Sequence, residues 1–230
     1  MDYPKRGKLG LFLVAGILAA STSLFFFGWL AEEMLEADTA HFDAVVRTAI
    51  HGFASPPLTS AMEVFSILGS VAPIVALTVL TIALFIYFHR PRAAALLAIA
   101  MTGAAVLDEV LKFAFHRPRP VAFFGTSPGS YSFPSGHALG SMCFYGALAL
   151  ILSSRIASRA ARVFLYLGAI LLVSAIGISR IYLGVHYPSD VIAGYLAAIV
   201  WVGAVGIAQE LIRRRGANGP ERMGGASKSL

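Results

Sequence analysis

The chain has 230 residues, of which 57% are hydrophobic and only 13% are charged, and its mean hydropathy is +0.75. This composition is far more apolar than that of an ordinary soluble domain. The net charge of +6 does not indicate nucleic acid as a partner, because the basic residues flank long apolar runs, where they anchor membrane helices. Cys143 is the only cysteine, which excludes an intrachain disulfide.

Six apolar runs come close to the ~20 residues that a helix needs to cross ~30 Å of hydrocarbon. They cover residues 9–30, 64–88, 93–115, 137–154, 163–179 and 191–209. Backbone groups in a bilayer must pair within their own segment. The runs therefore predict an all-α fold, a six-helix transmembrane bundle that forms one domain over residues 1–212. The first run also fits a secretory signal peptide, but its apolar core is longer than a typical one, and we expect a retained helix.

The distribution of charge predicts how the bundle is oriented. Lys and Arg gather at residues 5–8, 90–92, 155–162 and 213–215, on one side of the predicted bundle. By the positive-inside rule both termini are cytoplasmic, and residues 213–230 form a basic, disordered cytoplasmic tail. The first external loop carries six acids between residues 32 and 63, together with a short amphipathic segment around residues 42–50.

The third run ends in the first of three polar motifs, Lys112-x6-Arg119-Pro120. Asp108 lies four residues before Lys112, so we predict an ion pair along the helix. Arg117-Pro118 offers a rival frame for the same pattern. The family resemblance given below, with six residues between Lys and Arg-Pro, selects Arg119. We interpret Arg117 as a flanking charge that faces solvent or headgroups.

The second motif, Pro134-Ser135-Gly136-His137, stands where the fourth run begins. A loop-to-helix junction explains Pro and Gly structurally. A helix N-terminus, however, also presents unpaired N–H groups to a phosphate. We therefore expect Ser135 and Gly136 to contact phosphate and His137 to protonate a leaving oxygen.

The third motif places Arg180 at the end of the fifth run and His186 and Asp190 at the start of the sixth. A carboxylate four residues from a histidine can fix the tautomer of the ring and leave its other nitrogen free as a nucleophile. Taken alone, such a pair favours a structural role. The predicted topology, which rests only on Lys and Arg placement, brings all three motifs to the external face, and this agreement favours a catalytic role.

In order and spacing, the three motifs resemble those of the phosphatidic acid phosphatase type-2 superfamily, over residues 112–190. The resemblance implies a phosphatase that forms a phosphohistidine and needs no metal and no cofactor. It implies that His186 is the nucleophile, Asp190 its orienting carboxylate and His137 the acid and base. The implied phosphate-binding residues are Lys112, Arg119, Ser135, Gly136 and Arg180.

Six membrane spans favour a lipid phosphate as substrate, although the superfamily has soluble members. The resemblance points to the bacterial branch that acts on undecaprenyl diphosphate or phosphatidylglycerol phosphate, with phosphatidic acid as a further substrate. The expected location is the plasma (inner) membrane, with the site facing the exterior. A lipid phosphotransferase using the same histidine, and a non-catalytic transporter or scaffold, remain the alternatives.

Overall fold

The computed structural model of the chain describes residues 6–125 and 127–217, and side chains within residues 13–125 and 127–212. Within this part, helices are the only regular elements, as the all-α prediction requires. They are α1 (Arg6–Leu35), α2 (Thr39–His51), α3 (Pro56–Leu68), α4 (Val71–Tyr87), α5 (Pro91–Phe115), α6 (Gly136–Ser141), the π-helical turn η1 (Met142–Gly146), α7 (Ala147–Ser153), α8 (Arg159–Tyr182) and α9 (Pro188–Ala217). The first five residues of the predicted tail thus continue α9, and residues 218–230 lie outside the described part.

Five helical segments of the described chain are long and apolar enough to cross a membrane, or six if the bent pair α3–α4 counts as one span. The predicted fourth span is the continuous run α6–η1–α7, Gly136–Ser153. The predicted second span, 64–88, is not one straight helix. Its first residues belong to α3, which meets α4 at an angle of 49°, and the straight segment starts only at Val71.

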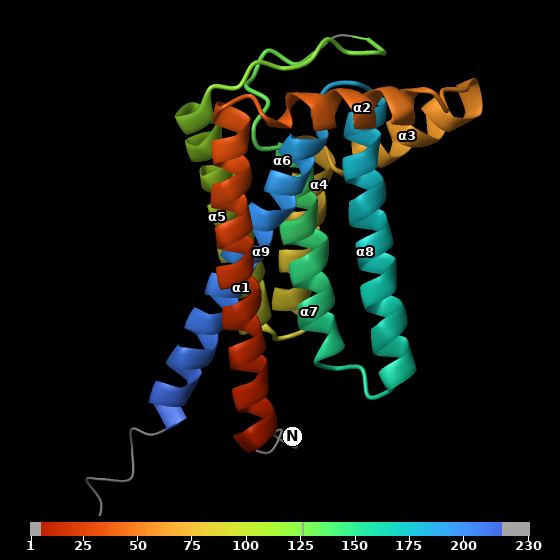
Figure 1. Ribbon diagram of the computed structural model, residues 1–230. Coiled ribbons are helices and arrows are strands. Elements are labelled where there is room, and N and C mark those ends of the chain that lie inside the picture. Colours follow the sequence, from red (N-terminus) through yellow and green to blue (C-terminus); the bar gives the residue numbers. More distant parts are fainter. Residues whose placement is uncertain (1–5, 126, 218–230) are drawn as a thin grey trace, which may run out of the picture.

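The long helices stand side by side, while α2 and α3 lie across one end of the bundle (Figure 1). The connection between α5 and α6 passes over that same end. The start of α1 and the end of α9 lie at the opposite end, which agrees with an even number of crossings.

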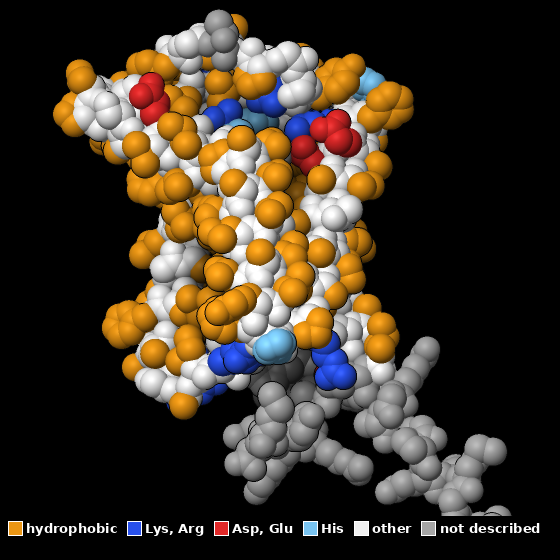
Figure 2. Space-filling view, turned by 180° about the vertical axis from the view of Figure 1, so that it is seen from behind, with side chains coloured by type: hydrophobic (Ala, Val, Ile, Leu, Met, Phe, Trp, Pro, Cys, Tyr) orange, Lys and Arg blue, Asp and Glu red, His pale blue; other side chains and the backbone are white. Residues whose placement is uncertain are grey.

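On the face shown in Figure 2, hydrophobic side chains cover the middle of the molecule, Lys and Arg gather toward both ends, and Asp and Glu toward one end. On α1, for example, Phe25 is 69% exposed and Trp29 50% exposed. A soluble protein rarely exposes a continuous apolar surface of this extent. Hydrocarbon is the medium in which such a surface is stable.

Small residues let α9 approach its neighbours closely near the end that carries α2 and α3. Ala193, Ala197 and Ala198 on α9 are buried. A Cβ atom at Gly194 would lie 2.7 Å from the carbonyl oxygen of Ser135, nearer than such atoms pack. Glycine at this position therefore lets α9 contact the start of α6 and brings the second and third motifs together.

Candidate active site

The described structure brings the segments that carry the eight residues singled out by sequence to the end of the bundle that carries α2 and α3 (Figure 1). Lys112 lies near the end of α5, Arg119 in the following loop, Ser135, Gly136 and His137 at the start of α6, Arg180 near the end of α8, His186 just before α9 and Asp190 in its first turn. Four separate stretches of chain thus contribute to one polar site.

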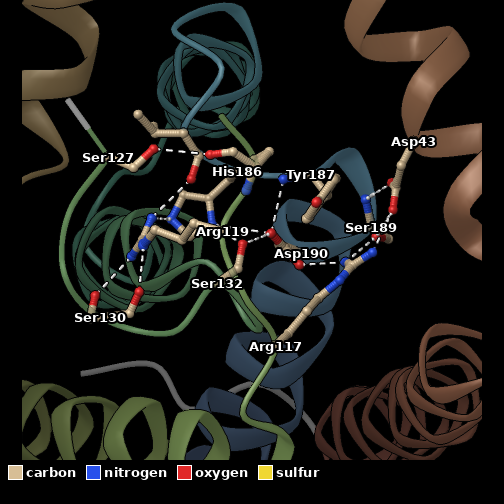
Figure 3. A network of polar contacts seen from close by, with 12 residues as sticks. Asp43, Arg117, Arg119, Ser127, Ser130, Ser132, His186, Tyr187, Ser189 and Asp190 are labelled. Atoms are coloured by element: carbon tan, nitrogen blue, oxygen red, sulfur yellow. Dashed lines mark hydrogen bonds and ion pairs between the residues drawn. The ribbon is translucent and has the colours of Figure 1, made fainter. Parts of the chain in front are cut away.

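His186 is 1% exposed and has a defined partner at each ring nitrogen. Its Nε2 lies 2.9 Å from Nη1 of Arg119, and its Nδ1 lies 3.3 Å from Oδ2 of Asp190 (Figure 3). A guanidinium can only donate hydrogen bonds, so Nε2 accepts and carries no proton. Nδ1 then bears the proton, and this N–H donates a hydrogen bond to Asp190.

The charge state of His186 follows from its burial. Removal from water lowers the pKa of the imidazole to about 4, and the nearby Arg119 and Arg180 act in the same direction, while Asp190 opposes them. At neutral pH the contact with Asp190 is therefore a hydrogen bond from an uncharged ring rather than an ion pair. An uncharged imidazole with an unprotonated Nε2 is a competent nucleophile.

The contact between His186 and Asp190 forms across the start of a helix and not along one. α9 begins at Pro188, so His186 precedes it, and Asp190 lies in its first turn. Oδ2 of Asp190 also accepts the backbone N–H of Tyr187 at 2.9 Å. One carboxylate therefore both closes the first turn of α9 and orients the histidine.

Asp190 has two further partners that the sequence did not suggest. Ser132 Oγ donates a hydrogen bond to Oδ2, and Arg117 Nη1 donates to Oδ1 at 2.6 Å. The interpretation of Arg117 as a solvent-facing or headgroup-facing charge is wrong. Its side chain is 12% exposed and also pairs with Asp43 of α2 at 2.8 Å.

Arg119 is fixed by the backbone on both sides of the site. Its Nε donates to the Ser130 carbonyl at 2.8 Å and its Nη1 to the Val185 carbonyl at 3.0 Å, while Nη2 donates to Ser130 Oγ at 2.9 Å. Partial burial lowers the pKa of Arg119 from its usual value, but an arginine keeps its charge at any physiological pH. The result is a fixed cation beside Nε2 of His186.

The start of α6 supplies a second group of phosphate-type contacts. Ser135 is fully buried, and its Oγ has no hydrogen-bond partner in the described structure. Gly136 packs against Asp108, since a Cβ atom there would lie 2.8 Å from Oδ2 of that carboxylate. Glycine is required for this close approach at the N-terminal end of the fourth span, where backbone N–H groups and the helix dipole favour an anion.

Two cations adjoin this helix start. Lys112 Nζ lies 2.6 Å from Oδ2 of Asp108, which confirms the predicted ion pair. Arg180 is 7% exposed and donates from Nη1 to the hydroxyl of Ser66 on α3, while its Nε has no partner in the described structure. The α3–α4 bend thus does more than break a span: it brings Ser66 to Arg180.

His137 is half-buried at the same end, close enough to Arg180, His186, Arg119 and Lys112 to interact with their charges. Its ring lies beside the α3–α4 bend, because a Cβ atom at Gly69 would be 3.4 Å from its Cδ2. The two histidines of the motifs therefore share one electrostatic environment.

A family model described as the PAP2 superfamily matches residues 93–212. The chain belongs to the PAP2 superfamily. The predicted family and the predicted class of enzyme, a phosphatase, are thereby confirmed. The matched segment contains the eight predicted site residues, but it begins after α2, so Asp43 lies outside it.

Named PAP2 relatives are similar over different shares of the chain. Phosphatidylglycerophosphatase B of Bacillus subtilis is 29% identical over 84% of this chain and 96% of its own length. An undecaprenyl-diphosphatase of Sulfolobus acidocaldarius is 36% identical over 50% of this chain and 54% of its own. Lipid A 1-phosphatase of Rhizobium johnstonii is 37% identical over 43% of this chain and 40% of its own.

Two solved structures share the PAP2 fold. The crystal structure of a transmembrane PAP2-type phosphatidylglycerolphosphate phosphatase from Bacillus subtilis superimposes with a TM-score of 0.78 at 26% identity, covering 85% of this chain and 98% of that one. LpxE of Aquifex aeolicus gives a TM-score of 0.53 at 25% identity, covering 73% and 95%. Both cover most of the helical bundle described above.

The described residues contain no group of three or more His, Cys, Asp or Glu side chains placed to hold a metal ion. The cations of the site are instead side chains. That the reaction of this PAP2 member needs no metal stays a prediction, which a chelation experiment can test.

Proposed function

We propose that this protein hydrolyses the phosphomonoester or diphosphate headgroup of a membrane lipid through a phosphohistidine on His186, at the external face of the plasma membrane. One observation carries the proposal. His186 is buried and uncharged, Asp190 accepts its Nδ1–H, and its Nε2 accepts a hydrogen bond from a fixed arginine.

In the first step, the hydrogen bond that Arg119 Nη1 gives to Nε2 passes to a phosphoryl oxygen of the substrate. The freed lone pair of Nε2 then attacks phosphorus, and the bond from phosphorus to the leaving oxygen breaks. His137 gives a proton to that oxygen, so the lipid leaves as an alcohol or, from a diphosphate, as a monophosphate. Arg180, Arg119 and Lys112 oppose protonation of His137, and the negative charge of the bound phosphate offsets them. General acid catalysis of this kind contributes ~10²–10⁴ in rate. Asp190 offsets the positive charge that develops on the ring of His186.

In the second step, His137 takes a proton from water while the water oxygen attacks phosphorus. The N–P bond breaks, inorganic phosphate leaves, and Nε2 regains its lone pair. Lys112, Arg119 and Arg180 neutralise the nonbridging oxygens in both steps, together with the N–H groups at the start of α6 and the hydroxyl of Ser135. Donors placed in advance where charge develops are the largest single contribution in many enzymes.

The proposed substrates are undecaprenyl diphosphate, phosphatidylglycerol phosphate and phosphatidic acid. An apolar bundle with a cationic site at one end suits an amphiphile whose chains stay in hydrocarbon while its phosphate meets the cations. Phosphatidylglycerol phosphate is favoured by the similarity to phosphatidylglycerophosphatase B, which extends over 84% of the chain. The membrane itself is the other partner.

The external orientation rests on charge. Five arginines lie at the end opposite the site: Arg90 and Arg155 in the connections, and Arg92, Arg159 and Arg162 in the first turns of α5 and α8. By the positive-inside rule this end and both termini are cytoplasmic. In this orientation α2 is an amphipathic helix on the outer surface of the membrane, above the site.

A panel of lipid phosphates tests the proposal. The purified full-length protein in detergent is given each of the three lipids, and inorganic phosphate and lipid products are both measured. Release of phosphate supports hydrolysis. Formation of a new phosphoester with an added alcohol supports the phosphotransferase. No turnover of any lipid phosphate, with the protein folded, supports the transporter or scaffold and overturns the proposal.

Chelation tests the expectation that no metal takes part. We expect full activity after dialysis against EDTA, because three cationic side chains neutralise the phosphoryl oxygens. Vanadate, which mimics pentacoordinate phosphorus, should inhibit. Complete loss of activity in EDTA with recovery on adding a divalent ion would instead indicate metal-assisted hydrolysis.

A further inference from the structure

Arg117 connects two buried carboxylates that are far apart in the sequence (Figure 3). Its Nη1 lies 2.6 Å from Oδ1 of Asp190, and its Nη2 lies 2.8 Å from Oδ2 of Asp43. Asp190 is fully buried and Asp43 is 1% exposed. The planar guanidinium thus uses its two terminal nitrogens on two different acids, a geometry that a lysine cannot reproduce.

Asp43 is held as firmly as Asp190. Its Oδ1 accepts the backbone N–H of Ser189 at 2.9 Å, and its Oδ2 accepts the Ser189 hydroxyl at 2.7 Å. Ser189 Oγ in turn accepts a hydrogen bond from Arg117 at 2.8 Å. Asp43 therefore binds the first turn of α9 directly, one residue before Asp190, and also holds the arginine that binds Asp190.

The two oxygens of Asp190 have different tasks as a result. Oδ2 accepts from His186, Ser132 and the backbone of Tyr187. Oδ1 accepts from Arg117. Rotation of the carboxylate would break the contact with Arg117, so the arginine fixes the oxygen that His186 needs.

We propose that Arg117, held by Asp43 of α2, is a positioning residue that orients Asp190 and, through it, the nucleophile His186. The proposal rests on the proposed function, since it assigns a role in forming the phosphohistidine. Arg117 is not a phosphate ligand. Both of its terminal nitrogens are occupied by Asp43 and Asp190, with Thr39 and Ser189 as neighbours.

The charges of the group suit this role. Two carboxylates and one guanidinium carry a net charge of −1 next to a ring that becomes cationic when the N–P bond forms. Without Arg117, two buried carboxylates would lie in a site of low dielectric without a cation between them. This would be strongly destabilising, because a buried charge without a partner has lost its hydration. Arg117 offsets one of the two negative charges and leaves the other for His186.

The competing explanation is that Arg117 only anchors α2 to the bundle. Arg47, which lies one turn after Asp43 on α2, provides the matched control. It donates to the backbone carbonyls of Val121 and Gly184 at 2.9 and 3.1 Å and packs on the ring of Phe123. It therefore ties α2 to the same end of the bundle, with no hydrogen bond to a carboxylate of the site.

The experiment compares Arg117→Lys, Arg47→Lys and wild type as full-length proteins in detergent. Single-turnover mixing with the best lipid substrate gives the rate of phosphohistidine formation, and a titration gives the affinity for vanadate. In metal sites, changing a residue that hydrogen-bonds and orients a metal ligand lowers metal affinity or activity roughly 10–100-fold. We expect a loss of this size in the rate for Arg117→Lys, with vanadate affinity changed by less than about twofold. Arg47→Lys should form phosphohistidine at close to the wild-type rate.

Several results would overturn the proposal. They are an unchanged rate in Arg117→Lys, an equal loss in Arg47→Lys, and a loss of vanadate affinity as large as the loss of rate. If Arg117→Lys does not fold, the double variant Asp43→Asn with Arg117→Gln keeps the net charge and is judged by the same outcomes. A wild-type protein that turns over lipid without phosphohistidine would refute the proposed nucleophile. The comparison of Arg117 and Arg47 in steady-state kcat would then still decide whether Arg117 acts on catalysis.

Discussion

Two sides of the site differ in how completely the protein satisfies its own polar groups. On the nucleophile side (Arg117, Ser132, His186 and Asp190), the two oxygens of Asp190 and both ring nitrogens of His186 have partners. In the phosphate cradle (Lys112, Ser135, Gly136 and Arg180), the Oγ of Ser135 and the Nε of Arg180 are buried without partners in the described structure.

Buried donors are nearly always hydrogen-bonded, and leaving one unpaired costs ~1–3 kcal/mol. The cradle therefore carries a local cost that the nucleophile side does not. An anion with several acceptor oxygens would remove that cost on binding. In the proposed mechanism the nucleophile is oriented before the substrate arrives, whereas the cradle gains its partners from the substrate. The following variants test this division.

The largest effect should come from His186→Ala. Because no other group on the nucleophile side can form the covalent intermediate, we expect turnover to fall by roughly 10⁴-fold or more, as it does when other covalent nucleophiles are removed. Released phosphate measures the loss, and vanadate binding tests whether the cradle remains intact. Retained activity in a folded His186→Ala protein would remove the nucleophile from this side of the site.

Two buried serines, three residues apart, allow a second test, because Ser132 belongs to the nucleophile side and Ser135 to the cradle. Ser132→Ala removes a hydrogen bond to an ionised carboxylate, worth ~1.5–3 kcal/mol, so we expect a lower free energy of unfolding and slower phosphohistidine formation. Ser135→Ala removes a hydroxyl that has no partner in the described structure. It should leave stability unchanged or raised and weaken vanadate binding about tenfold.

Ser141→Ala is the control for both serine variants. Ser141 is also fully buried, but its hydroxyl donates only to the Ala138 carbonyl of its own helix, at 3.3 Å. Thermal denaturation and vanadate titration of the three variants are compared. Equal behaviour of Ser132→Ala and Ser135→Ala would contradict the division into two sides.

The cradle could be predicted from sequence much better than the support of the nucleophile. Its members Lys112, Ser135, Gly136 and Arg180 stand in short motifs with fixed spacing, and hydropathy places their helices. Asp43 lies in no motif and 74 residues before Arg117, so only the folded chain shows that they meet. The α3–α4 bend was not predicted for a related reason. The apolar run continues through Gly69 and Ser70, but the helix axis changes direction there.

A smaller effect should come from Asp108→Asn, because this carboxylate adjoins the cradle. Asp108 pairs with Lys112 and touches Gly136, so its charge opposes an incoming phosphate. The amide keeps the shape and removes the charge, and we expect vanadate affinity to rise about three- to tenfold, or roughly 1 kcal/mol for a partly exposed pair. Glu109→Gln, at the exposed neighbouring position, is the control. Weaker binding in Asp108→Asn would mean that the carboxylate positions Lys112 for the substrate.

The smallest change is expected from acidification, at the nucleophile itself. Burial lowers the pKa of His186 to about 4, so its ring should stay neutral as the pH falls from 7 to 5. In the unfolded chain the same ring takes up a proton near pH 6.5. The contribution of His186 to stability is thus fully present above that pH and declines as the pH falls toward 4. The ¹⁵N resonances of the His186 ring, assigned by their loss in His186→Ala, report its protonation directly and independently of the substrate. A ring that becomes protonated near pH 6.5 in the folded protein would show that water reaches the nucleophile, and the two sides of the site would then not differ in the way that their hydrogen bonds indicate.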